Sequence, residues 1–108
     1  MPQGVEQAIK ATNEQADFIL SAGEGVTDWP AGTSNDPAAE KVRQVAARLA
    51  QVMDERGLSA RAVAKLAGIG VGTVQVIQHG NRWPDTRAVA RLEVALDTAL
   101  WPAHDGGA

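Results

Sequence analysis

Cysteine and tyrosine are absent from this chain of 108 residues, and phenylalanine occurs once. The lack of cysteine excludes disulfides, thiolate metal sites and cysteine catalysis. The scarcity of aromatic residues disfavours strands, whereas the 20 alanines favour helices. No apolar run approaches the roughly 18 residues of a membrane span, and the first ten residues lack the basic start of a signal peptide. We therefore expect one small all-α domain, soluble and cytoplasmic, with no membrane segment.

Positive charge is also scarce overall, because 10 Lys and Arg face 13 Asp and Glu, for a net charge of -3. The charges are divided along the chain. Residues 1–37 contain six acids and one base, whereas residues 38–103 contain nine bases and six acids, an excess of +3. An acidic arm attached to a basic body favours a nucleic-acid partner for the body.

Residues 1–36 form the arm. Within it, residues 4–21 carry apolar side chains at steps of three and four, which predicts a weakly amphipathic helix. Residues 21–37 hold three glycines and two prolines among small polar residues, which is typical of a linker, with Trp29 as its one anchor. Four interpretations of the arm stay open: a flexible extension, a dimerisation element, an acidic cover for the basic face, and a docking element for a partner protein.

Residues 37–103 form the body, and residues 104–108 a frayed tail. An acidic cap followed by proline starts the first helix of the body at Asp36 or Pro37, and Gly57 ends it. The apolar stripe of this helix contains Val42, Val45, Ala46, Leu49, Val52 and Met53.

The last helix of the body begins after the capping residue Asp85 and stops before Pro102. We expect Trp83 to close the core beneath this helix and Trp101 to cap the core at its far end. The predicted inner face of the helix contains Val89, Leu92, Ala95 or Leu96, and Ala99.

Two short helices lie between the longer ones, over residues 60–67 and 71–78. Ser59 caps the first of them, Gly80 terminates the second, and Gly68 between them sits where the turn needs a positive φ. The predicted inward residues are Val63, Ala64 and Leu66 on the first, and Val74 and Ile77 on the second. Two short helices joined by a tight turn and supported by longer helices make a helix-turn-helix.

The stretch LAQVMDERGLSARAVAKLAGIGVGTVQVIQHGNRWPD, residues 49–85, resembles the phage-repressor-like (Cro or Xre) class of DNA-binding domains. The pieces that carry the likeness are RGLS, LAGI, GTVQVIQHG and NRWPD, in this order and spacing. The likeness extends over about residues 41–100. It implies a lambda-repressor-like bundle of four to five helices and a sequence-specific transcriptional regulator, a repressor of bacterial or phage origin.

The resemblance also implies that helix 71–78 lies in the major groove of double-stranded DNA. The candidates for base contacts are Val71, Gly72, Gln75, Val76 and Asn81. The candidates for contacts with the DNA backbone are Ser59, Arg61, Lys65, Thr73, His79, Arg82 and Arg87. A homodimer on a two-fold operator is the usual geometry of such domains, and a monomer stays open.

The predicted recognition surface departs from the family pattern. Family members often carry Ser, Arg, Gln or Lys where this chain has Gly70, Val71, Gly72 and Val76, and only Gln75 can make a bidentate contact with adenine. Two alternative functions therefore stay open. One is a protein-interaction module that keeps the fold without reading bases, and the other is the antitoxin of a toxin–antitoxin pair whose arm binds the toxin.

The sequence indicates neither an enzyme nor a cofactor. His79 and His104 are far apart and lack acidic or thiol neighbours at ligand spacing, so we expect no metal site. The sequence also contains no nucleophile motif and no glycine-rich phosphate loop after a strand.

Overall fold

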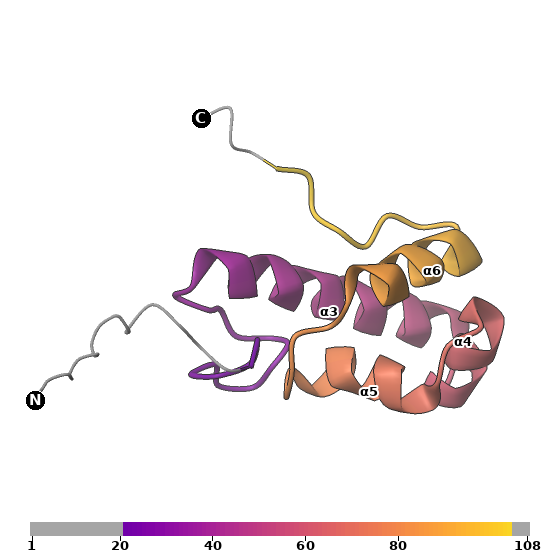
Figure 1. The fold of residues 1–108 in the computed structure, drawn as a ribbon, viewed down its shortest axis with the longest axis horizontal. Coiled ribbons are helices and arrows are strands. Elements are labelled where there is room, and N and C mark those ends of the chain that lie inside the picture. Colours follow the sequence, from indigo (N-terminus) through magenta and orange to yellow (C-terminus); the bar gives the residue numbers. More distant parts are fainter. Residues whose placement is uncertain (1–20, 105–108) are drawn as a thin grey trace, which may run out of the picture.

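A computed structural model of the chain describes residues 21–104 and contains four α-helices and no strand among them (Figure 1). The helices are α3 (Pro37–Arg56), α4 (Ala60–Ala67), α5 (Val71–His79) and α6 (Thr86–Leu96). The predicted all-α helix-turn-helix bundle is confirmed, with α4 and α5 as its two short helices. The helix expected from residue 4, and the roles considered for it, lie outside the described residues.

Three of the four helices, α3, α4 and α6, begin at the predicted side-chain caps. The carboxylates of Asp36 and Asp85 accept hydrogen bonds from the amides of residues 39 and 88, at 2.8 and 2.7 Å, and the Ser59 hydroxyl accepts one from residue 62 at 3.1 Å. Each bond satisfies one of the first-turn amides that a helix leaves without an internal partner. The turn between α4 and α5 depends on Gly68, whose φ of 68° is a conformation that side chains disfavour.

The hydrophobic core lies between α3 and the three shorter helices α4, α5 and α6, and residues of all four helices contribute to it (Figure 1). All six residues of the predicted α3 stripe are buried, as are Val74 and Ile77 of α5. Each short helix thus holds its position through a few buried side chains, because α4 packs on α5 and α6 and α5 packs on α3. The largest fully buried side chains are Leu49, Ile77, Leu92, Leu96, Val45, Val52, Val63 and Val74.

Two predictions of inward-facing residues are wrong. Leu66 is 58% exposed, because the buried arc of α4 contains Val63, Ala64 and Ala67 and residue 66 lies to one side of it. Ala99 is exposed as well, because α6 ends at Leu96 instead of continuing to Pro102.

The early end of α6 has a local cause. The carboxylate of Glu93 accepts hydrogen bonds from the amides of Leu100 and Trp101, at 2.8 and 2.9 Å. Asp97 adopts a left-handed conformation, with φ of 50°, and turns the chain back. Leu100, only 3% exposed, enters the core in the place expected for Ala99.

The expected roles of two tryptophans are also wrong. Trp83 and Trp101 are 39% and 43% exposed and do not belong to the core cluster. The indole that packs on the core is that of Trp29, and Leu100 supplies the apolar contact at the far end of α6.

Residues 21–36 form an ordered part of the body, which corrects their interpretation as a linker. The Trp29 indole Nε1–H donates to the carbonyl oxygen of Ile77 at 3.1 Å, and the amide of Gly23 donates to the carbonyl of Gly80 at 2.7 Å. The Arg43 guanidinium donates to the carbonyl of Pro30 at 2.7 Å. The segment therefore closes over the C-terminal end of α5, where a helix leaves carbonyl groups without internal partners (Figure 1).

Candidate nucleic-acid interface

Helix α5 has an inner and an outer face that follow from its sequence. Val74 and Ile77 are completely buried, which fixes the rotation of the helix about its axis. Gly72, Gln75 and His79 are exposed, and Val76 is half-buried beside them. Because the first and the last of these four residues are each three or four positions from the two between them, all four share one face and form the outer surface of α5.

Four of the five predicted base-contact residues lie on α5, and the fifth lies just beyond it. Gly72 and Gln75 are exposed, whereas Val71 and Val76 are half-buried. Asn81 is exposed and follows Gly80, the residue at which α5 ends. Gln75 is thus the member of this set that combines helical rigidity, exposure and a side chain able to both donate and accept hydrogen bonds.

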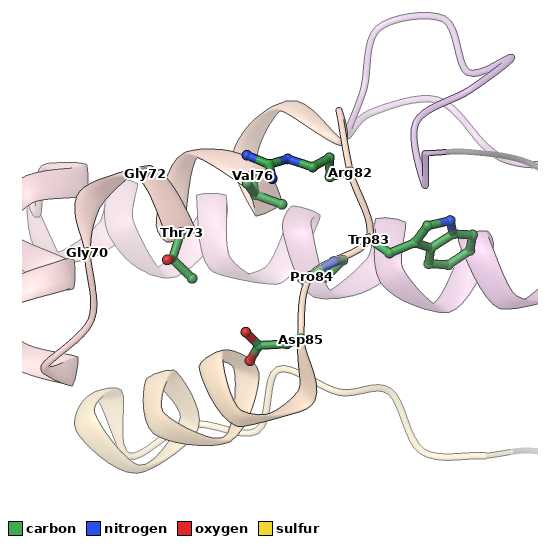
Figure 2. Close-up of a pocket in the computed structure, with 8 residues that line it drawn as sticks. All are labelled: Gly70, Gly72, Thr73, Val76, Arg82, Trp83, Pro84 and Asp85. Atoms are coloured by element: carbon green, nitrogen blue, oxygen red, sulfur yellow. The ribbon is translucent and has the colours of Figure 1, made fainter.

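A hollow of about 460 Å³ lies along α5 (Figure 2). One wall is the first half of α5, and the other is the segment that leads into α6. Figure 2 shows Thr73 and Asp85 pointing toward one another across it, and Arg82 extended beside Val76. The lining residues are Gly70, Gly72, Thr73, Val76, Arg82, Trp83, Pro84 and Asp85.

The predicted backbone-contact residues are spread over three parts of the surface. Thr73 and Arg82 line the hollow along α5, and Arg87 joins Thr73 in a second hollow of about 240 Å³ beside the turn at Gly68. Ser59 lies elsewhere, in a hollow shared with Gln78, and its hydroxyl oxygen already caps α4. The remaining members of the set, Arg61, Lys65 and His79, are exposed on α4 and at the end of α5.

One cation that belongs with these residues was not predicted. Arg91 lines the second hollow together with Arg87, one helical turn away, and its Nη1 lies close enough to Gly68 that a Cβ there would be 3.4 Å from it. The sequence could have indicated this cation, because Arg87 and Arg91 are four positions apart on a predicted helix and therefore share one face.

The surface charge of the helix-turn-helix is positive. Residues 57–96 contain five Lys and Arg and two acids, Asp85 and Glu93. Both acids accept hydrogen bonds from backbone amides, at 2.7 Å from residue 88 and at 2.8 Å from residue 100. An excess of three positive charges over this part of the chain suits an anionic partner.

The ion pair between Glu40 and Arg43 stands apart from this surface. Oε2 of Glu40 and Nη2 of Arg43 are 2.7 Å apart on the first turns of α3. The Arg43 guanidinium also donates a hydrogen bond to the carbonyl of Pro30. The hydrogen bond from Arg43 lowers the pKa of Glu40 to about 2. This pair fixes residues 21–36 to the body, so its charges are engaged within the protein.

Neither a metal site nor a membrane span emerges between residues 21 and 104. That part of the chain contains no group of three or more His, Cys, Asp or Glu residues that could hold a metal ion. None of its helices has the length and apolarity that crossing a membrane requires.

Comparison with known proteins gives no match among family models, curated proteins or solved structures. The relationship to phage-repressor-like domains therefore stays a prediction from the motif.

Proposed function

We propose that this protein is a sequence-specific DNA-binding transcriptional regulator, a repressor of bacterial or phage origin that acts in the cytoplasm. Helix α5 enters the major groove, and Gln75 contacts a base edge. The observation that carries the proposal is the outer surface of α5, where Gln75 is exposed on a short helix whose opposite side is anchored by two completely buried residues. A rigid helix with an exposed amide side chain is suited to read adenine.

Positive charge supports the same function. Arg82 and Arg87 line the two hollows beside α5, and Arg61 and Lys65 are exposed on α4, so cations lie on both sides of the proposed recognition helix. Such residues release counterions when they meet phosphates, and this release supplies most of the non-specific affinity for DNA.

A titration with a labelled random-sequence duplex tests the proposal. We expect binding at about 50 mM salt and a strong loss of affinity at about 200 mM, because four to six phosphate contacts give a steep salt dependence. Absence of binding at the lower salt concentration would rule out the regulator.

A protein-interaction module is the alternative that a specific observation favours. An apolar patch on α4 and α6 contains Leu66, Ala90 and Val94, and Val94 is 82% exposed. A hollow of about 310 Å³ lies within this patch. Large exposed apolar side chains that gather in one place are typical of a protein contact.

The same patch fits the homodimer that a two-fold operator requires. In an antiparallel pairing of two α6 helices in the register centred at residue 92, the exposed residue Ala90 of one copy lies opposite Val94 of the other, and Arg87 lies opposite Asp97. Such a pairing places apolar side chains opposite apolar side chains and a base opposite an acid, as a self-complementary two-fold interface requires. We therefore propose that a second copy covers the patch and that the apolar contact and the DNA contact are parts of one function.

A further inference from the structure

Gly72 has no function in the fold that the structure can account for. It is the second residue of α5, its backbone is helical, and a Cβ built on it meets nothing within 4 Å. Other glycines are required by their surroundings. A Cβ at Gly23 would lie 2.7 Å from the carbonyl oxygen of Gly80, and Gly68 adopts a positive φ.

Glycine at this position is also unfavourable for α5 itself. Glycine is the weakest helix former after proline, and α5 has only nine residues and no side-chain cap at Gly70. A glycine that weakens a short helix and fills no tight space inside the molecule indicates a close approach from outside.

The position of Gly72 specifies what approaches it. Gly72 shares the outer surface of α5 with Gln75 and Val76, and it borders the hollow lined by Arg82 (Figure 2). An α-helix with its side chains is about 10–12 Å across, and the major groove of DNA is about 12 Å wide. A helix whose leading turn has no side chain at the contact position therefore sits deeper in the groove.

We propose that Gly72 is a specificity-determining residue, whose bare main chain contacts duplex DNA and brings Gln75 within reach of a base edge. The inference rests on the proposed function. Val76, one turn beyond Gly72, then packs on the groove floor, where it meets a thymine methyl group. The close approach at Gly72 thereby explains how an outer surface with Gln75 as its base-contacting polar side chain discriminates between DNA sequences.

The test compares stability and binding in Gly72→Ala and Gly72→Leu. Both substitutions favour the helix and enter open space, so we expect each to raise the thermal midpoint, Gly72→Ala by about 4–8 °C. Binding is measured by fluorescence anisotropy on a duplex selected from a random pool by the unaltered protein and on an unselected duplex. For Gly72→Ala we expect about tenfold weaker binding to the selected duplex and a change of less than about twofold on the unselected one, with a larger loss for Gly72→Leu.

Gln51→Ala is the control. It also replaces a weaker helix former with alanine at an exposed helical position, but on α3, away from both the outer surface of α5 and the apolar patch on α4 and α6. This variant should bind the selected duplex with the same affinity as the unaltered protein.

Three results would overturn the inference. Gly72→Ala could bind the selected duplex as tightly as the unaltered protein, it could lose affinity equally for both duplexes, or it could be less stable, which would show that the fold needs this glycine. Failure of the proposed function has a different signature, because the unaltered protein would then bind no duplex or prefer none.

Discussion

The indole ring of Trp29 lies directly against Gly80, so closely that a Cβ on Gly80 would be 2.6 Å from Cε2 of the ring. The two residues are 51 positions apart, one in the segment that precedes α3 and the other at the end of α5. Their contact, together with the hydrogen bond from Trp29 to the Ile77 carbonyl, makes residues 21–36 a support for the proposed recognition helix. The position of α5 therefore depends on a segment that contributes nothing to its outer surface.

Gly80→Ala should destabilise the protein by about 3 kcal/mol. Part of the loss comes from the left-handed φ of 66°, and the rest comes from displacing the indole. Gly57→Ala is the matched control, because Gly57 has a φ of 64° but open space where its Cβ would lie, so only about 1 kcal/mol should be lost. Chemical denaturation measures the free energy of unfolding of both variants. If the two variants lost the same stability, the Trp29 ring would not constrain residue 80.

Trp29→Ala should lower the free energy of unfolding by about 2–3 kcal/mol, since a large side chain packed on the core is removed. Trp29→Phe keeps most of the ring but loses the 3.1 Å hydrogen bond to Ile77, and about 1 kcal/mol should be lost. In the Trp29→Ala background the extra cost of Gly80→Ala over Gly57→Ala should disappear. A double-mutant cycle checks this coupling, and additive losses would contradict it.

The local features of the fold could be predicted, and the features that depend on distant partners could not. Asp36, Ser59 and Asp85 cap residues only three positions away, so their function is visible in a short stretch of sequence. The hydrogen bond of Trp29 joins residues 48 positions apart, and nothing in a stretch of glycine, proline and small polar residues indicates its acceptor. Glu93 binds amides seven and eight positions ahead, a reach that helical periodicity does not describe.

The same distinction holds for the candidate interface. The exposure of Gln75 follows from the burial of its neighbours Val74 and Ile77, which periodicity identifies. The hollow beside α5 could not be predicted, because its second wall is a loop whose path depends on the packing of α6. The exposure of Leu66 was missed for a related reason, since an eight-residue helix leaves the edge of its buried arc poorly defined.

Acid should weaken the attachment of residues 21–36 through the pair formed by Glu40 and Arg43. Because the hydrogen bond from Arg43 lowers the pKa of Glu40 from 4.5 to about 2, the pair stabilises the folded state fully above pH 4.5. That stabilisation is lost as the pH falls from 4.5 toward 2. Glu40→Gln should cost about 1 kcal/mol at pH 7 and should show a smaller loss of stability across this pH range. Thermal melts between pH 5 and pH 2 measure the change. If the melting temperatures of the two proteins fell equally over this range, the loss of stability could not be assigned to Glu40.

Val94→Lys should convert a dimer into a monomer, because it places a charge at the centre of the apolar patch on α4 and α6, where Val94 is 82% exposed. Sedimentation equilibrium over a range of protein concentrations measures the change. Gln51→Lys is the control, since it adds the same charge at an exposed position of α3. A monomeric unaltered protein, or a dimer that tolerates Val94→Lys, would show that a second copy does not cover this patch.

Gln75→Ala and Arg82→Ala should weaken DNA binding in different ways. Gln75 is exposed on the outer surface of α5 with no cationic group, so its loss should relax discrimination at one base position by about 1–3 kcal/mol and leave the salt dependence unchanged. Arg82 borders the hollow as an exposed cation, so its loss should weaken all duplexes alike and reduce the salt slope by about one charge. Competition with single-base variants of the selected duplex at two salt concentrations separates the effects. A uniform loss from Gln75→Ala would mean that another face of α5 meets the bases, because a residue that points into the groove must change affinity at its own base pair more than at any other.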